Sequence, residues 1–461
     1  MIFFYILVLI SPMPNHPLFE APLAGFTVVK WLGIICCGYA VFRLLSCRRP
    51  PAFLKGWEIR SFLVLLGIAT VSFCTLSKTG NLSFNPIFMY FNYLPLFFTT
   101  ICVLDTYERL QKTFLAAIAG ASVASLYVIR EFQASGGSNL RPGYIAGDAN
   151  YFATCTLLVI PMAVYFVKMK GSRLQRWFSA VSLVIMLIAF TLASSRGGLV
   201  GLCVAMLCMV LCSGQSRRAA IVITILVIPM LIFSPASPLS RMLHPNYGDY
   251  VGAQVRREFW SGGLDMISNH PITGIGLGNF TAHSVSKEVE GFQGIACNTF
   301  LEVAAELGIP GFLAYCAVVA GALFSGGKLR AEGKRSHDPF LQYAGQAIQA
   351  GFLGFSASAF FVSAEYQKPF WIMAALTSAV PTLLRDHSCR SKHLVQQLRA
   401  ASTPNSSLSD RCFEDRPSTD SLVAPRGGLA LYPSGAAAQP FWTPLEHLDV
   451  WPKTALDGSS K

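Results

Sequence analysis

Charged residues are scarce in this chain, and their scarcity excludes an ordinary soluble domain. Only 13% of the 461 residues are charged and 53% are hydrophobic, whereas a soluble globular domain has roughly 25% charged residues. Apolar runs of about 20 residues, long enough to cross a hydrocarbon core of about 30 Å, recur along the chain. The period-2 alternation of an outer-membrane barrel is missing. The composition therefore predicts an all-α, polytopic integral membrane protein.

Eleven apolar segments are long enough to be membrane spans, and residues 1–10 form a shorter apolar segment before them. The short segment has no basic n-region and is followed by Pro12 and Pro14, which does not fit a cleaved signal peptide. We therefore predict 11–12 transmembrane helices, with twelve favoured because an even number places both termini on one side. The long segments are 23–46, 58–77, 84–104, 112–130, 149–167, 177–194, 198–213, 219–234, 308–326, 341–363 and 369–385.

The thirteen cysteines form no CxxC pair, and no group of Cys and His has the spacing of a zinc site. Most of them lie inside predicted spans, where cysteine is commonly a small apolar residue. The sequence therefore predicts neither a metal site nor a cofactor. Cys297 differs from the others because it lies at the end of the longest polar loop.

Basic residues give the chain a net charge of +12, but their distribution does not fit nucleic-acid binding. They gather in alternate loops between the predicted spans, which is the positive-inside pattern. The basic loops are therefore predicted to face the cytoplasm, and the polar segment 235–296 to face the opposite side. The basic loops contain Arg48, Arg49, Lys55 and Arg60; Arg109 and Lys112; Lys168, Lys170, Arg173 and Arg176; Arg217 and Arg218; and Lys328, Arg330, Lys334 and Arg335.

Two regions are expected, a transmembrane domain over residues 1–385 and a tail over residues 386–461. The tail is rich in Ser, Pro and Gly and has no apolar periodicity, which predicts a disordered cytoplasmic segment. Within the domain, segment 235–296 is much longer than the other loops, and long ordered loops usually carry function. Its stretch REFWSGGLDMISNHP predicts a helix at the membrane interface. The apolar positions of this helix are Phe259, Trp260, Leu264 and Ile267.

A glycine-rich stretch, ITGIGLGNF, follows this helix and is predicted to be a turn. Its Gly274, Gly276 and Gly278 do not indicate a dinucleotide site, because the strand, the βαβ unit and the downstream acid of such sites are missing. The glycines instead suit a tight turn or close approach to a ligand. A second helix is predicted over NTFLEVAAELG, and Gly308 and Pro310 separate it from the next span.

Arginines occur on the side of the membrane where basic residues are otherwise rare. Arg141 precedes a span, Arg196 lies where two spans are tightly joined, and Arg256 and Arg257 lie in the long loop. Arginine is well suited to bidentate contact with phosphate, so Arg141, Arg196 and Arg256 together predict an anion site. The alternative for any one of them is an arginine that snorkels at the membrane surface.

Four titratable side chains in and after the long loop are further candidates. His270 and His283 have imidazoles that can act as bases near neutral pH, although an isolated loop histidine is more often only solvated. Glu302 and Glu306 are four residues apart and share one face of the predicted helix. They either orient a base or form a polar face, and the sequence does not decide between the two.

Four segments occur in the order, and at the membrane depth, that is typical of one family of bacterial enzymes. They are RPGYIAGDANYFATCTLLVIP, SSRGGLVGL, RREFWSGGLDMISNHPITGIGLGNF and NTFLEVAAELGIPGFLAY, all within residues 141–315. In these segments the chain resembles the O-antigen ligase and polymerase family of polytopic membrane glycosyltransferases. The resemblance implies a bacterial inner-membrane protein with a periplasmic large loop and a glycan donor on undecaprenyl pyrophosphate.

The resemblance also implies roles for particular residues. Arg196 and Arg256 would hold the pyrophosphate and stabilise the charge on the leaving group without a metal. Arg141 would help to position the lipid-linked donor. The other residues assigned to substrate binding are Arg257, Asn298 and Glu302.

The sequence departs from the family pattern at one position. The family places a histidine directly before the Asn of its last motif, where this chain has Cys297. The thiol, with an unperturbed pKa of about 8.5, is not an equivalent base for a sugar hydroxyl. In order of preference, His283 or His270 supplies the imidazole, catalysis rests mainly on the arginines, or the activity is lost or changed. The catalytic candidates are therefore Arg256, His283, His270 and Cys297.

Two other functional classes are alternatives to a glycosyltransferase. A transporter fits less well because clear charged pairs in mid-span are missing. An inactive scaffold for the assembly of envelope glycans is suggested by Cys297 alone. For the glycosyltransferase, the expected partners are a lipid-linked oligosaccharide donor, membrane lipids, and an acceptor that is a glycan, lipid A-core of lipopolysaccharide or a protein. Nucleic acid is not expected.

Overall fold

A computed structural model describes most of the chain up to residue 385. All described residues belong to one compact unit, Met1–Leu398. The span predicted at 219–234 lies outside the described residues except for Ile228, and the predicted tail, 386–461, lies wholly outside them. The described residues are 1–20, 22–23, 26–46, 55–76, 86–137, 141–169, 172–212, 228, 243, 247–286, 289 and 292–385.

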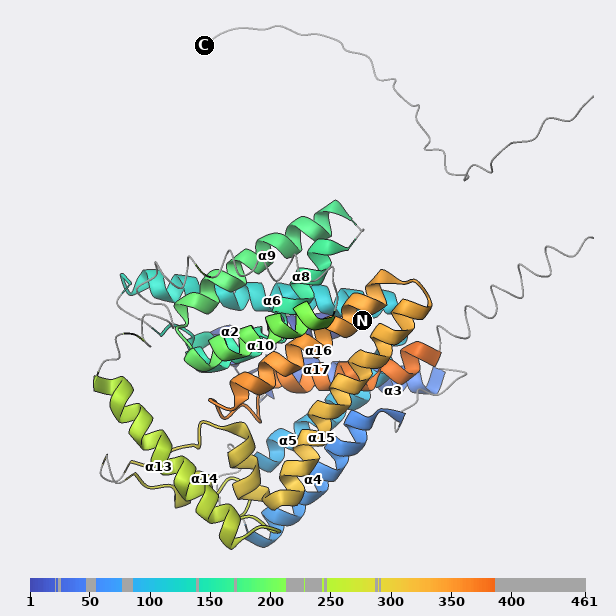
Figure 1. Ribbon diagram of the computed structural model, residues 1–461. Helices are drawn as coiled ribbons and strands as arrows, with labels where there is room; N and C mark the ends of the chain where they lie inside the picture. Colours follow the sequence, from blue (N-terminus) through green and yellow to red (C-terminus); the bar gives the residue numbers. More distant parts are fainter. Residues whose placement is uncertain are drawn as a thin grey trace, which may run out of the picture. The chain divides into compact units, whose positions relative to one another are not determined.

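The fold is all-α, as the composition predicts (Figure 1). Two strands of two residues each, β1 (Pro22–Leu23) and β2 (Phe26–Thr27), form a small antiparallel pair beside the helices. The helices are α1 (Ile2–Ile10), α2 (Pro17–Glu20), α3 (Val28–Ser46), α4 (Trp57–Leu76), α5 (Pro86–Val103), α6 (Tyr107–Ala134), the 3-10 turn η3 (Tyr144–Ala146), α7 (Ala149–Thr156), α8 (Ile160–Lys168), α9 (Arg173–Leu192), α10 (Arg196–Cys212), α13 (Tyr247–Asn269), α14 (Phe280–His283), α15 (Thr299–Arg335), α16 (Pro339–Ala359) and α17 (Lys368–Ser378).

Seven helical segments of the described part are long and apolar enough to cross a membrane. They confirm the predicted polytopic membrane fold, whereas the total of 11–12 spans stays a prediction. Helix α1 has nine residues and a length of only about 14 Å at 1.5 Å per residue, less than half of the hydrocarbon core. The seven segments are α3, α4, α5, α6, the segment Ala149–Lys168 that contains α7 and α8, α9, and α15.

Close helix packing in the core depends on glycines at the crossing points. A Cβ atom added to Gly201 of α10 would lie 2.5 Å from the carbonyl oxygen of Gly354 in α16, and one added to Gly345 of α16 would clash with the carbonyl oxygen of Gly326 in α15. Small residues at such positions let helix backbones approach closely in membrane proteins. Helix α16 is therefore held between α10 and α15, which fixes the start of α10 relative to the start of α15.

An aromatic cluster fills the space between α4, α5, α15 and α17. Trp371 of α17 is fully buried, and its ring stacks on Tyr93 of α5 with centroids 5.2 Å apart. Phe62 of α4 and Tyr315 of α15 contact the same indole edge-on. Aromatic pairs of this kind each contribute about 0.5–1.5 kcal/mol beyond the burial of their surface. The cluster gives the site described next a rigid base.

Candidate functional site

Helix α13 forms one wall of the candidate site and is longer than the sequence predicts. The predicted helix begins near Arg257, whereas α13 starts ten residues earlier, at Tyr247. Its buried side includes Val255 and Phe259, which pack against the start of α15. Leu264, which is predicted to lie on the apolar face at the membrane interface, is 61% exposed. Phe259 and the small Gly263 form the face that packs against α15.

The glycine-rich stretch after α13 is a turn, as predicted, and it docks on a break in α15. Gly308 has φ 68° and ψ −177° inside α15, so the helix is interrupted there. The backbone N–H groups of Ile275 and Gly276 donate to the carbonyl oxygens of Ala305 and Glu306, at 2.9 and 3.1 Å. The N–H of Ile309 donates to the carbonyl oxygen of Pro271 at 2.8 Å. The turn thus satisfies carbonyl groups that the break leaves without helical partners.

The same turn is also fastened to the end of α4. The N–H of Leu277 donates to the hydroxyl oxygen of Ser72 at 3.1 Å, and the Asn279 side-chain amide donates to the carbonyl oxygen of Leu76 at 3.0 Å. Gly274, Gly276 and Gly278 all have positive φ, between 66° and 102°. The positive φ angles explain why glycine occupies these three positions. The hydrogen bonds fix the long loop to two membrane helices, α4 and α15.

Three helices begin close together on this side of the protein. Asp148 caps α7, Ser195 caps α10 by accepting from the N–H of Gly198, and Asn298 caps α15. The Ser195 hydroxyl donates to the Asn150 side chain at 2.9 Å, which joins α7 to α10. The loop after α16 joins α10 to α15. Helix N-termini carry partial positive charge and free N–H groups, which together favour a bound anion.

Contacts between α10 and α15 run through the loop of residues 360–367. The N–H and the hydroxyl of Thr299 both donate to the carbonyl oxygen of Val362, at 3.0 and 2.7 Å. A Cβ atom on Gly197, in the first turn of α10, would lie 2.6 Å from Cβ of Phe361. The first turns of α10 and α15 therefore meet the same short stretch of chain.

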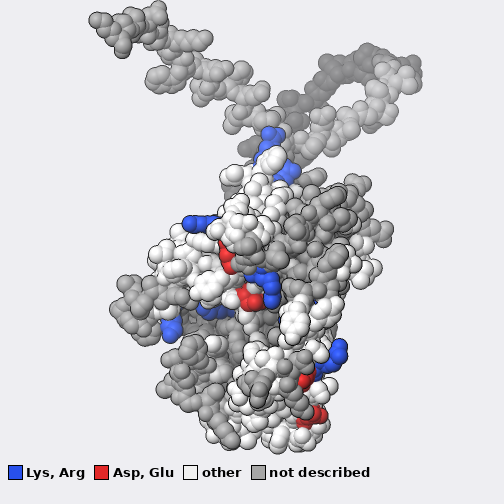
Figure 2. Space-filling model, turned by 90° about the vertical axis from the view of Figure 1, so that its left-hand side faces the viewer, with Lys and Arg blue, Asp and Glu red and all other residues white. Residues whose placement is uncertain are grey.

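The three arginines singled out from the sequence lie around these helix starts. The Arg256 guanidinium of α13 acts on the Cys297 thiol and lowers its pKa. Arg141 lies 3.8 Å from Asp148, and Arg196 lies 3.4 Å from Asp249 of α13. Asp249 and Arg256 are seven residues apart, so they share one face of α13 at a spacing of about 10 Å. In Figure 2, basic and acidic side chains lie next to each other near the middle of the face shown.

Cys297 lies at the centre of this arrangement, in a turn with left-handed backbone, φ 49°. Trp260 of α13 fixes the turn, because its indole N–H donates to the carbonyl oxygen of Ala296 at 2.9 Å. Burial raises the pKa of the Cys297 thiol, while the Arg256 guanidinium lowers it and the Glu302 and Asp148 carboxylates raise it. Burial is the largest of these effects, so the thiol is protonated at neutral pH and is not a base.

Glu302 and Glu306 are buried, at 5% exposure each, so they are not a solvated polar face. Glu302 accepts hydrogen bonds from the N–H of Ala296, at 3.2 Å, and from the Ser363 hydroxyl. Glu306 accepts from the N–H of Phe280 at 3.1 Å. The first glutamate thereby holds the turn that carries Cys297, and the second holds the glycine-rich segment.

A comparison with protein families identifies the region that contains most of these residues. Residues 181–316, from α9 to the first half of α15, match the family described as O-antigen ligase. Over these residues the chain is similar to O-antigen ligases. The match supports the resemblance noted in the sequence. No curated protein matches the chain.

Arg196, Arg256, Cys297 and Glu302 lie within the matched residues, whereas Arg141 precedes them. Arg257 is also within it, but its side chain is exposed while that of its neighbour Arg256 is half-buried. Asn298 uses its side-chain oxygen to cap α15, accepting from two N–H groups at 3.1 and 3.2 Å.

The two candidate histidines are placed differently from the arginines. His270 follows the last residue of α13 and is exposed. It is fourteen residues beyond Arg256, or about 21 Å along the helix axis. His283 is exposed at the end of α14, where its ring contacts the carbonyl oxygen of Asn279 at 2.9 Å. The structure therefore does not bring His270 to Cys297, and it places His283 on the side of the glycine-rich turn.

Sequence reasoning missed three acidic residues of this region. Asp148 and Asp249 pair with arginines, and Glu365 is buried in the loop after α16. Burial raises the pKa of Glu365 well above its usual value. An Asp directly before a helix, as in GDAN, is a recognisable cap signal, but the ion pairs depend on contacts between distant segments. Among the described residues, no three His, Cys, Asp or Glu side chains are grouped for a metal ion.

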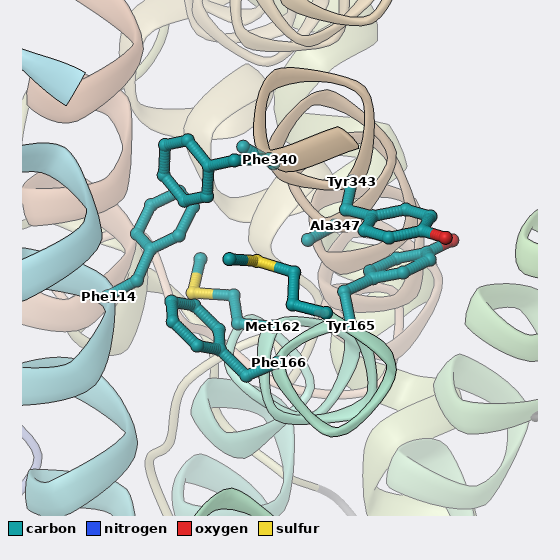
Figure 3. Close-up of a pocket in the computed structure, with 9 residues that line it drawn as sticks. Phe114, Met162, Tyr165, Phe166, Phe340, Tyr343 and Ala347 are labelled. Atoms are coloured by element: carbon teal, nitrogen blue, oxygen red, sulfur yellow. The ribbon is translucent and has the colours of Figure 1, made fainter. Parts of the chain in front are cut away.

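A pocket between α6, α8 and α16 is not part of the candidate site (Figure 3). It is lined by apolar and aromatic side chains, with Tyr165 and Tyr343 stacked at 5.2 Å. Its volume of ≈ 10 Å³ has room for only about one water molecule. It lies where α16 begins and α8 ends, at the opposite ends of these helices from the arginines.

Proposed function

We propose that this protein transfers or polymerises a glycan carried on undecaprenyl pyrophosphate onto an acceptor at the periplasmic face of the bacterial inner membrane. The observation that carries the proposal is the gathering of Arg141, Arg196 and Arg256 around the starts of α7, α10 and α15. Guanidinium groups and helix N-termini are both favourable partners for a phosphate group. The matched ligase domain supports the same class of reaction.

In the proposed reaction, an acceptor oxygen or nitrogen attacks the anomeric carbon of the donor glycan. The bond between that carbon and the pyrophosphate oxygen breaks, and the bonding electrons leave with the lipid pyrophosphate. Arg196 and Arg256 stabilise the negative charge that develops on this leaving group. Arg141 positions the donor, and the exposed Arg257 contributes long-range attraction.

The proposal also assigns the residues around Cys297. Asn298 starts α15 and orients its first N–H groups, and Glu302 holds the turn in place. Neither side chain needs to contact the glycan for this purpose. His283 remains a candidate for contact with the acceptor from the side of the glycine-rich turn, and His270 for contact at the loop surface. Cys297 fills the position of the family histidine without acting as a base.

The test is transfer by the purified full-length protein from an undecaprenyl-pyrophosphate glycan to three acceptors: lipid A-core, a growing glycan and a protein. We expect product with one of them, and a loss of about 100-fold or more in kcat for Arg256→Ala and Arg196→Ala. Arg176→Ala removes an exposed arginine at the start of α9 and should leave transfer unchanged. Full transfer by a well-expressed Arg256→Ala variant would refute the pyrophosphate role.

Two other classes make different predictions in the same experiment. A transporter would move the lipid-linked glycan across a vesicle membrane without forming a product on any acceptor. An inactive scaffold would do neither, but its deletion would still change the surface glycans. The grouping of arginines at helix starts favours transfer, because a pyrophosphate leaving group needs stabilisation during bond breaking.

A further inference from the structure

Of the titratable groups directly at the start of α15, neither the Cys297 thiol nor Glu302 is suited to act as the base for the acceptor. The Cys297 thiol is protonated at neutral pH. The Glu302 carboxylate is buried, and its Oε2 atom already accepts from the N–H of Ala296 and from the Ser363 hydroxyl. A large glycan acceptor cannot reach a carboxylate that is enclosed in this way. A carboxylate can act as the base here only if it is both exposed and close to Cys297.

Asp148 meets both conditions. Its side chain is 43% exposed, and it caps α7. Asn150 of α7 joins the start of α10, and the first turn of α10 meets the same loop as Thr299, two residues after Cys297. The Asp148 carboxylate also helps to raise the pKa of the Cys297 thiol. The Oδ1 atom accepts from the N–H of Asn150 at 2.6 Å. The Oδ2 atom lies 3.8 Å from Arg141, which is longer than a hydrogen bond.

The backbone around Asp148 is held firmly, as the position of a catalytic group requires. Glu131 of α6 accepts hydrogen bonds from the N–H groups of Gly143 and Tyr144, at 2.9 and 3.2 Å. A Cβ atom on Gly143 would lie 2.5 Å from Cα of Ala149. The turn before α7 is therefore packed directly against the first residue of the helix that Asp148 caps.

We propose that Asp148 is the general base for the acceptor, in place of the histidine that the family resemblance leads one to expect at position 297. This role rests on the proposed glycan transfer. Asp148 Oδ2 takes the proton of the acceptor hydroxyl as the acceptor oxygen bonds to the anomeric carbon and the lipid pyrophosphate leaves. The proton then passes to water, to which Asp148 is exposed.

The substitution Asp148→Asn separates the chemical role from the structural one. Asparagine caps a helix about as well as aspartate but cannot take a proton. Asp338→Asn is the matched control, because Asp338 caps α16 in the same way, accepting from the N–H of Phe340 at 2.9 Å. We expect both variants to unfold at the wild-type temperature, and only Asp148→Asn to lose activity.

General bases typically contribute about 100- to 10,000-fold, so Asp148→Asn should lower kcat for lipid-pyrophosphate glycan transfer by about 100-fold or more. The KM for the donor should change by no more than about threefold. Adding Cys297→His to Asp148→Asn should restore kcat at least about tenfold, since it puts an imidazole beside the same acceptor.

Retention of more than half of the wild-type kcat by Asp148→Asn would overturn this role while leaving the proposed function intact. A loss that appears mainly in the donor KM, or that Cys297→His does not relieve, would also overturn it, because Asp148 would then act through donor binding or structure. A wild-type protein that transfers glycan to none of the acceptors would instead refute the proposed function, and this role with it.

Discussion

Gly308→Ala tests whether the break in α15 builds the site wall. The φ and ψ of Gly308, 68° and −177°, lie in a region that is nearly restricted to glycine and that costs another residue about 1–3 kcal/mol. An added Cβ would also clash with the carbonyl oxygen of Ile272 and lie 2.9 Å from that of Pro271. Both are backbone atoms, so relief of the clash requires the glycine-rich turn to move away from α15.

Movement of the turn would weaken two hydrogen bonds, from the N–H of Ile275 to Ala305 and from the N–H of Ile309 to Pro271. Each is worth about 1 kcal/mol. The total destabilisation is therefore about 3–5 kcal/mol. At about 2–4 °C per kcal/mol, thermal unfolding of the purified protein in detergent should begin at least about 6 °C below the wild type.

Gly327→Ala is the matched control on the same helix. Its added Cβ would meet the Gln349 side chain at 3.4 Å, an ordinary contact. Alanine in a helix interior is about 0.5–1 kcal/mol more favourable than glycine, so this variant should unfold at or slightly above the wild-type temperature. An unfolding temperature for Gly308→Ala within 2 °C of the wild type, with wild-type transfer, would refute the reasoning.

Two further predictions concern Cys297. Cys297→His should preserve or raise glycan transfer, since it restores the residue of the family pattern, and a clear loss of product in the in vitro assay would give the cysteine a specific role. Arg256→Gln should slow alkylation of Cys297 by N-ethylmaleimide. The thiolate is the reactive form, and loss of the guanidinium removes a group that lowers the thiol pKa. The pH midpoint of alkylation, followed by mass spectrometry of the peptide, should therefore move upward; a midpoint that stays or falls contradicts the Arg256–Cys297 contact.

The features that sequence could predict are those set by local patterns. The length of the apolar segments predicts α4, α5, α6 and α15, and Gly308 and Pro310 together predict the interruption of α15. The glycine-rich turn follows from its composition, although the partners of the turn, at Ser72 and Leu76, lie some 200 residues earlier in the chain. Such pairings depend on how the spans pack, and no local pattern carries that information.

For the same reason, the sequence predicts the arginines of the candidate site but not the acidic residues that contact them. Arg141, Arg196 and Arg256 stand out because basic residues are rare on their side of the membrane. Their acidic neighbours do not stand out. The sequence around Asp148 indicates only a helix cap, and Asp249 is one of many polar residues in a polar loop. The burial of Glu302 could not be foreseen either. It depends on Ser363 in a loop 61 residues further along the chain.

The pairing of Arg196 with Asp249 bears on how a donor can bind. Asp249 is almost fully buried, with 4% of its side chain exposed, whereas 37% of the Arg196 side chain is exposed. A buried carboxylate is costly without a nearby cation, so we expect Arg196 to keep this contact when a pyrophosphate arrives. The guanidinium has five N–H groups in a planar fork, a geometry that suits contact with a carboxylate and a phosphate. Because Asp249 belongs to the same helix as Arg256, an Arg196 that holds both Asp249 and the donor would keep α13 fixed over the leaving group during transfer.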